Sequence, residues 1–223
     1  MSLSELKWDD AGLVTVVVQD QFTGEIRMLA HANLEALQAT LSTGLAHFYS
    51  RSRRALWCKG ETSGNTIAVH TVYADCDGDA LVYSADPHGP SCHTGEPSCF
   101  FRPVTAAGEV ADAAAQPGVL PTLPALFRTL EERSRGAGAK SYTRSLLDKG
   151  CAKIGEKVTE EAQEYVQALL QESNERVLSE AADLTYHMLV GLLARGVTLR
   201  QLEQQLATRF GLSGLEEKAN RNR

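Results

Sequence analysis

Three cysteines, Cys76, Cys92 and Cys99, are close enough along the chain to bind one metal ion, and thiolates are ligands that zinc prefers. Structural zinc sites have four protein ligands, whereas three protein ligands and one open position are typical of catalytic zinc. Zinc lowers the pKa of water at the open position to near neutrality, and His93, next to Cys92, is placed to move a proton. The alternative is that these thiols are simply buried, since cysteine is among the most buried residue types.

Carboxylates surround the first of these cysteines, at Asp75, Asp77 and Asp79. Alternate residues of an extended chain point to one side, so the sequence predicts that the three carboxylates face the same way. Three hard oxygen ligands suit Mg²⁺. An acidic turn is the alternative, whereas a calcium-binding EF-hand loop is discounted because its last ligand position would hold Asp86 instead of glutamate.

A basic segment with several glycines lies upstream, at residues 50–65. Glycine allows backbone N–H groups to face an anion, while arginine and lysine supply charge and serine and threonine supply donors. This composition fits phosphate binding, although a basic surface loop is equally common. The residues predicted to contact phosphate are Arg51, Arg53, Lys59, Thr62, Ser63, Gly64 and Asn65.

Two predicted helices in the second half of the chain carry acids beside apolar stripes. The stripes consist of Ile154, Val158, Tyr165 and Leu169 on one helix, and Val177, Ala181, Leu184, Met188 and Leu192 on the next. Glu161 falls within the first stripe, where a carboxylate is costly unless it is paired or bound to a cation. Two facing acidic helices can hold Mg²⁺, and the predicted ligands are Glu160, Glu161, Glu164, Glu180 and Asp183. The alternative is ordinary helix charges that pair with Lys153 and Lys157.

The elements that position the first group of residues follow an α+β pattern. A β-branched run at residues 13–18 and a second run at 26–30 predict a hairpin with its corner at Gly24. Asn33 and Gly44 are predicted to cap a helix, and residues 46–49, 67–74 and 80–84 are predicted strands. The expected fold of residues 1–102 is therefore a small mixed sheet with a helix.

Residues 103–122 are rich in proline, alanine and glycine, contain no aromatic residue, and are predicted to form a linker. Helical periodicity dominates after this segment. The expected fold of residues 123–223 is an all-α helical bundle.

The composition of the 223-residue chain limits its function classes. The formal charge of −6 argues against a nucleic-acid binder, which needs a basic face. Neither a secretory signal nor a membrane span is recognisable, so we expect a cytoplasmic protein that does not insert into membranes. Five cysteines without a CxxC pair make a disulfide framework improbable.

Four strings in the first half resemble the phosphoribosyl-AMP cyclohydrolase family of histidine biosynthesis; they are residues 47–53, 57–65, 75–79 and 92–100. The resemblance runs over residues 12–101 and implies hydrolytic opening of an adenine ring between N1 and C6. It implies zinc on Cys76, Cys92 and Cys99, and magnesium on Asp75, Asp77 and Asp79. It also implies a homodimer in which Cys76 completes the zinc site of the partner chain, with His47 and His93 as candidates for proton transfer. Cys58 receives no role.

The second half resembles the phosphoribosyl-ATP pyrophosphohydrolase family over residues 124–210, chiefly in residues 157–164 and 180–187, with support from 141–143 and 146–150. Thr159 departs from the glycine expected there. The resemblance implies attack of water at the α phosphorus with release of pyrophosphate, helped by Mg²⁺.

Together the two resemblances predict a bifunctional hydrolase that performs the second and third steps of histidine biosynthesis on small nucleotide substrates. Two other hypotheses are a general nucleotide pyrophosphohydrolase with a non-catalytic zinc module, and a non-enzymatic, zinc-bridged interaction protein.

Overall fold

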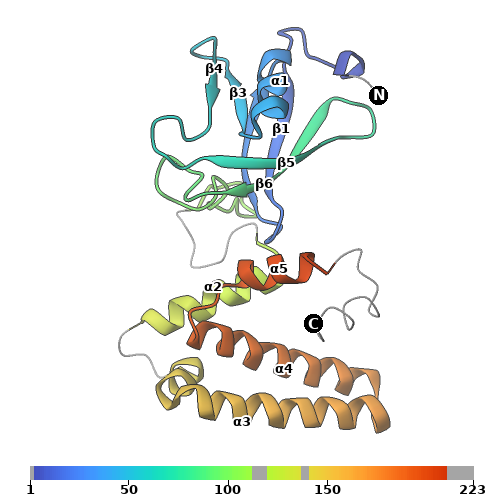
Figure 1. Ribbon diagram of the computed structural model, residues 1–223, viewed down its shortest axis with the longest axis vertical. Coiled ribbons are helices and arrows are strands. Elements are labelled where there is room, and N and C mark those ends of the chain that lie inside the picture. The colour runs from blue at the N-terminus through green and yellow to red at the C-terminus, as the bar shows by residue number, and fades with distance from the viewer. Residues whose placement is uncertain (1–2, 112–119, 137–140, 210–223) are drawn as a thin grey trace, which may run out of the picture. The chain divides into compact units, whose positions relative to one another are not determined.

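The computed structural model describes residues 3–111, 120–136 and 141–209. The chain divides into two compact units, Met1–Pro121 and Thr122–Arg223 (Figure 1). Residues 112–119 of the predicted linker lie outside the described residues, as do residues 210–223 at the C-terminal end.

The first unit contains a mixed four-stranded sheet, as predicted, with strand order β2-β1-β6-β5. Strand β1 pairs antiparallel with β2 and parallel with β6, and β5 pairs antiparallel with β6. Strands β3 and β4 form a separate antiparallel pair. After the 3-10 turn Leu3–Glu5, the elements are β1 (Val14–Asp20), β2 (Ile26–Ala32), α1 (Leu34–Thr43), β3 (His47–Ser50), β4 (Ala55–Cys58), β5 (Ile67–Ala74) and β6 (Ala80–Pro87).

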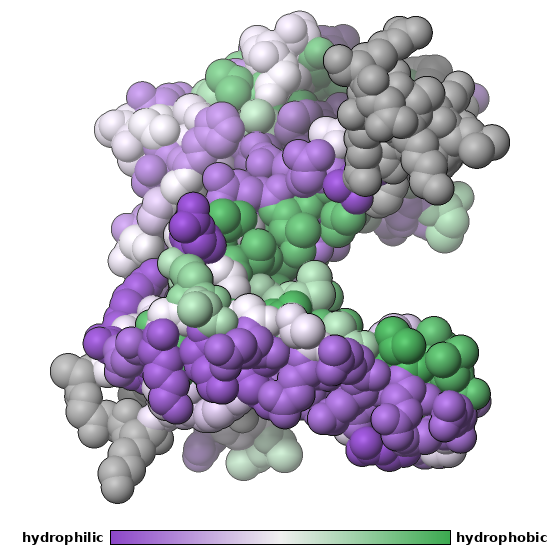
Figure 2. All heavy atoms as spheres, turned by 60° about the horizontal axis from the view of Figure 1, so that its bottom comes forward, coloured by the Kyte–Doolittle hydropathy of each residue, from purple (hydrophilic) through white to green (hydrophobic). Residues whose placement is uncertain are grey.

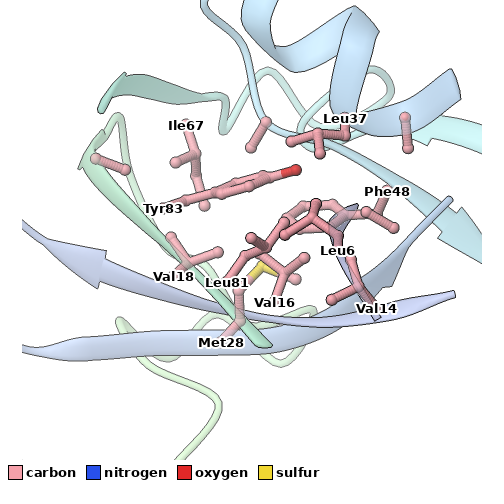
Figure 3. Packing of buried hydrophobic residues seen from close by; sticks show 14 residues of the cluster. Leu6, Val14, Val16, Val18, Met28, Leu37, Phe48, Ile67, Leu81 and Tyr83 are labelled. Carbon is pink, nitrogen blue, oxygen red and sulfur yellow. The ribbon is translucent and has the colours of Figure 1, made fainter. Parts of the chain in front are cut away.

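Alternation along β1 explains how the sheet buries one face. Val14, Val16 and Val18 are buried, whereas the residues between them are only half-buried. Figure 3 shows these valines packed with Phe48, Tyr83 and other apolar side chains of this core. The helix α1 has the predicted caps: the Asn33 side chain accepts a hydrogen bond from the Ala36 N–H, and Gly44 adopts a left-handed conformation with φ 70°.

One strand of this unit was not predicted, and one local prediction is wrong. The predicted phosphate segment is interrupted by strand β4, which the sequence does not signal because it is short and half of it is exposed. Residues 75–79 are not extended: they form the bend that joins β5 to β6, with Gly78 at φ 80°. The bend forms because the Asp75 carboxylate accepts hydrogen bonds from the backbone N–H groups of the residues that follow it.

The second unit is helical, as predicted, and consists of α2 (Thr122–Arg135), α3 (Tyr142–Gln171), α4 (Asn174–Ala194) and α5 (Leu199–Ala207). Helices α3 and α4 form a long antiparallel pair (Figure 1). Their core includes Leu146, Ile154 and Val190, packed with Phe127 and Leu130 of α2. Gly150, at φ 79° and ψ 178°, interrupts α3 and sets residues 142–149 at an angle to the rest of the helix.

The predicted apolar stripes of this pair are only partly buried. Leu169 and Met188 are about half exposed, at 58% and 49%, which contradicts their predicted inward position. The core that α2 helps to form does not extend along the whole pair. The hairpin end, where α3 joins α4, is therefore not covered by this core. Figure 2 shows apolar side chains gathered at that end, where Val166, Leu170 and Leu178 are also exposed. No described helix is long and apolar enough to cross a membrane.

Candidate active sites

Two of the predicted zinc ligands are brought together by a compact loop that follows β6. Backbone N–H groups of Ser91 and Cys92 donate to the carbonyl groups of Pro97 and Glu96, at 3.1 Å each, which folds residues 91–97 back on themselves. The Cys99 N–H then donates to the carbonyl of Arg27 in β2 at 2.9 Å. The loop thus carries Cys92 and Cys99 to one end of the sheet.

Arg27 of β2, which forms a buried ion pair with Glu25, holds this loop through hydrogen bonds. The Arg27 guanidinium lies 2.7 Å from the Glu25 carboxylate, and both side chains are almost fully buried. Arg27 also donates to the Ser91 hydroxyl at 3.1 Å and to the Gly89 carbonyl at 3.0 Å. Removing a buried charge from water is costly, and this cost is offset here because the donors of Arg27 have acceptors.

The loop closes one side of a pocket of about 520 Å³. Among the predicted site residues, the pocket is lined by Arg53, Lys59, Thr62, Ser63, Asn65, Cys92, His93 and Cys99. The structure therefore places predicted zinc ligands and predicted phosphate ligands around one cavity. Arg51, Gly64 and His47 do not line it. Trp57 and Ser91 do line it, although no separate signal in the sequence indicated a role for either.

The phosphate side of the pocket is held by Lys59 and Gly60. Lys59 is 9% exposed, and its ammonium group donates to the Asn65 carbonyl at 3.1 Å; desolvation lowers the pKa of this lysine. Gly60 has φ 86°, and a Cβ added there would lie 2.4 Å from the backbone carbon of Asn65. Glycine is therefore required for the chain to turn this tightly.

The two thiols in the pocket differ in acidity. Cys99 is exposed, yet partial desolvation of its thiol in the pocket raises the pKa of Cys99 to about 11, and the adjacent Cys92 contributes in the same direction. Burial also opposes ionisation of Cys92, but hydrogen bonds from the Thr94 side chain and backbone outweigh it and lower the pKa of Cys92. The Thr94 hydroxyl donates to Cys92 Sγ at 3.0 Å. A pair of adjacent soft donors fits zinc, which binds thiolates.

The third predicted zinc ligand lies elsewhere. Cys76 is exposed in the β5–β6 bend, where its thiol and the carboxylates of Asp75 and Asp77 lie within 4.8 Å of one another. Asp79 is not one of these three ligands, although it adjoins them: a hydrogen bond with Asp75 and the charge of Asp77 raise the pKa of Asp79. Among the described residues, no such group of three or more ligands includes Cys92 or Cys99. One chain therefore does not bring the three cysteines together.

The two predicted proton-transfer histidines occupy different positions. His93 lines the pocket, with Nδ1 4.0 Å from Cys92 Sγ. His47, in β3, points Nδ1 to the Leu45 carbonyl at 2.8 Å, which leaves Nε2 as the nitrogen available for chemistry.

In the second unit, the predicted magnesium ligands converge between α3 and α4. Oxygens of Glu161, Glu164 and Glu180 lie within 4.8 Å of one another, and Glu161 and Glu180 are buried, so Glu161 has the predicted inward position. Desolvation raises the pKa of Glu180, and the charges of Glu164 and Asp183 add to this increase. Converging hard oxygens fit Mg²⁺. Glu160 is exposed and lies outside this group.

Two cations neutralise part of this acidic group. Lys157 lies 3.0 Å from Glu161 and 2.9 Å from Glu160, and Arg176 contacts Glu180. The hydrogen bond with Glu160, followed by that with Glu161, raises the pKa of Lys157. Glu160 therefore fits the alternative prediction, that of an ordinary helix charge paired with a lysine. Glu161 also pairs with Lys157, but it is buried and lies beside two other carboxylates.

Tyr142 and His187 adjoin the same group, and neither was predicted to be a site residue. His187 is buried, and its Nδ1 lies 3.7 Å from Glu161. Two sequence signals point to His187: its position beside the acids of α4 and its place at the end of the string 180–187 that carries the family resemblance.

Comparison with known proteins matches both halves of the chain. The family model for phosphoribosyl-AMP cyclohydrolase matches residues 28–101, and that for phosphoribosyl-ATP pyrophosphohydrolase matches residues 123–210. A histidine biosynthesis bifunctional protein HisIE of Wolinella succinogenes is 40% identical over 98% of this chain and 97% of its own length. The HisIE protein of Thermus thermophilus is 44% identical over 92% of each chain, and the chloroplastic protein of Arabidopsis thaliana is 41% identical over 99% of this chain and 80% of its own. The chain belongs to the family of bifunctional histidine-biosynthesis hydrolases, with a cyclohydrolase domain followed by a pyrophosphohydrolase domain.

Proposed function

We propose that the second unit releases pyrophosphate from phosphoribosyl-ATP and that the first unit then opens the adenine ring of the resulting phosphoribosyl-AMP by hydrolysis. The observation that carries this proposal is that each matched region contains its own group of chemically suitable side chains. The first region has the pocket with Cys92 and Cys99, and the second has the converging Glu161, Glu164 and Glu180.

In the pyrophosphohydrolase site, we assign magnesium to these three glutamates, with Asp183 beside them. Magnesium, when bound, neutralises charge on a polyphosphate and on the developing transition state. Lys157 contacts Glu161 and Arg176 contacts Glu180, and these two cations limit the repulsion among the carboxylates.

In the cyclohydrolase site, Cys92 and Cys99 are the zinc ligands that one chain supplies. Zinc, when bound, supplies an activated water near neutral pH for attack on a ring carbon. Lys59, Arg53 and the donors of Thr62, Ser63 and Asn65 bind phosphate of the substrate, and His93 is placed to move a proton beside Cys92. His47 Nε2 is the second candidate for proton transfer. We further assign a magnesium ion to Asp75, Asp77 and Asp79.

We also propose a homodimer in which Cys76 of one chain completes the zinc site of the other. Two observations support it: Cys76 is exposed and separate from the other cysteines, and apolar side chains such as Leu169, Leu170 and Leu178 are exposed at the hairpin end of α3 and α4. We place both reactions in the cytoplasm, where the five free cysteines would stay reduced.

The test is to incubate the full chain with phosphoribosyl-ATP, Mg²⁺ and Zn²⁺ and to identify the products by mass spectrometry. Pyrophosphate together with the ring-opened product supports both assignments. Accumulation of phosphoribosyl-AMP, despite zinc bound to the protein, would contradict the cyclohydrolase assignment. Absence of pyrophosphate would contradict the pyrophosphohydrolase assignment.

A further inference from the structure

The first residue of α3 combines exposure with a fixed orientation. Tyr142 is 55% exposed, yet its hydroxyl lies 3.2 Å from Nε2 of the buried His187. Its ring lies nearly parallel to that of Tyr186, at 17°, and edge-on to the His187 ring, at 89°. An exposed aromatic ring held in one orientation is suited to contact another planar group.

His187 is itself fixed by the backbone. Its Nδ1 lies 2.9 Å from the Asp183 carbonyl, and a carbonyl oxygen only accepts, so Nδ1 carries the hydrogen. In the neutral ring Nε2 then accepts, and the Tyr142 hydroxyl donates to it. The histidine therefore determines where the phenol group lies.

Tyr142 and His187 lie next to the cluster formed by Glu161, Glu164 and Glu180. His187 Nδ1 is 3.7 Å from the Glu161 carboxylate, so one imidazole ring separates Tyr142 from a proposed metal ligand. A second contact holds the same segment: the hydroxyls of the fully buried Thr143 and of Tyr186 lie 2.8 Å apart. The interruption at Gly150 allows residues 142–149 to make these contacts with α4.

We propose that Tyr142 contacts the substrate of the pyrophosphohydrolase site by stacking on its nucleobase, with its ring oriented by the neighbouring rings of Tyr186 and His187. The inference rests on the proposed function of this unit. The substrate has two chemically different ends: its phosphates are attracted to metal ions and cations, whereas a nucleobase presents a planar face that stacks on aromatic rings. The carboxylate group and Tyr142 supply these two surfaces side by side.

The same contacts would also be explained if Tyr142 only packed α3 against α4, and the experiment separates these explanations. Pyrophosphate release from phosphoribosyl-ATP is measured with two competitors, a non-hydrolysable ATP analogue and inorganic triphosphate, because this assay reports only on the second unit. In Tyr142→Leu we expect the inhibition constant of the ATP analogue to rise about tenfold or more, while that of triphosphate stays unchanged. Tyr142→Phe and Tyr142→Trp keep an aromatic face and should stay within about threefold of the wild type.

Tyr73→Leu is the matched control, since Tyr73 is a similarly exposed tyrosine, at 58%, in the other unit. Mn²⁺ affinity without substrate is measured for every variant and should not change in Tyr142→Leu, because the carboxylates remain. Equal weakening of both competitors, or of neither, would overturn the proposal. If Tyr142→Leu does not fold, a tenfold loss of analogue binding in a folded Tyr142→Phe protein would overturn it as well. A wild-type protein that releases no pyrophosphate would contradict the proposed function itself, whereas an active wild type with an unselective Tyr142→Leu variant would contradict only the stacking.

Discussion

Cys76 and Cys92 lie beyond opposite ends of β6. Cys76 is in the bend before Ala80, whereas the loop that carries Cys92 follows Pro87 and is fastened to Arg27 at the other end of the sheet. A strand of eight residues spans roughly 25 Å, far more than the reach of two side chains to one ion. A zinc site that contains both thiols therefore requires a second chain.

Mixing two inactive variants tests this sharing. In a dimer formed by Cys76→Ser and Cys92→Ser chains, one site receives both defects and the other receives none. We expect each variant alone to lack cyclohydrolase activity and a 1:1 mixture, exchanged and refolded together, to regain about a quarter of the wild-type activity. Cys151→Ser is the control that should retain full activity. No recovery from a mixture of demonstrably mixed dimers would exclude the shared site.

The adjacent glutamates of α3 should differ sharply in importance. Glu161 is buried in the carboxylate group, while Glu160 is exposed and pairs only with Lys157 among the contacts described. We expect Glu161→Gln to lower kcat for pyrophosphate release about a hundredfold, because magnesium contributes several kcal/mol to the transition state. Glu160→Gln should stay within about threefold, as for other exposed ion pairs. Equal losses in the two variants would show that both carboxylates bind the metal.

Zinc binding should release a proton from Cys99. The pKa of this thiol in the metal-free protein is raised to about 11, so the thiol is protonated at neutral pH, whereas zinc binds the thiolate. Because the proton must leave, zinc affinity should rise as the pH rises and should level off only near the raised pKa. Calorimetry at pH 7 in buffers of different ionisation enthalpy measures the released protons. A heat of binding that does not depend on the buffer would contradict the expectation, and Cys99→Ser should release fewer protons.

Gly60 and Gly64 provide a matched pair for the phosphate side of the pocket. Both have positive φ, at 86° and 76°, but a methyl group at Gly60 would collide with the Asn65 backbone, whereas the space at Gly64 is open. Gly64→Ala should carry only the conformational cost, about 1 to 2 kcal/mol. Gly60→Ala should lower the stability of the first unit further and raise KM for phosphoribosyl-AMP. Urea unfolding and steady-state kinetics measure both effects, with pyrophosphate release as the internal control. Equal stability losses would mean that the loop relaxes around the added methyl group.

The sequence predicted features that arise from local patterns. The β-branched run of β1, the caps at Asn33 and Gly44, and the helical periodicity after residue 122 depend on neighbouring residues, and the structure confirms them. The position of Glu161 inside an apolar stripe likewise predicted its burial.

Features that depend on distant parts of the chain were not predictable in this way. Helical periodicity indicates which face of α3 is apolar, but it does not indicate where the covering helices end, and so the exposure of Leu169 was missed. The contact between Tyr142 and His187 joins residues 45 positions apart, which no local pattern specifies. The bend at residues 75–79 is a different case, because it is local: the Asp75 side chain caps the backbone of the residues that follow it, and this competes with the extended conformation that alternation alone predicts.

Each unit has its own hydrophobic core, one formed by residues between Leu6 and Ala85 and the other by residues between Phe127 and Leu199. A substitution that unfolds one core therefore need not disturb the other. In genetic terms, a cell with two defective alleles, one damaged in each half of the chain, should still grow without added histidine, because each product would retain the reaction that the other has lost.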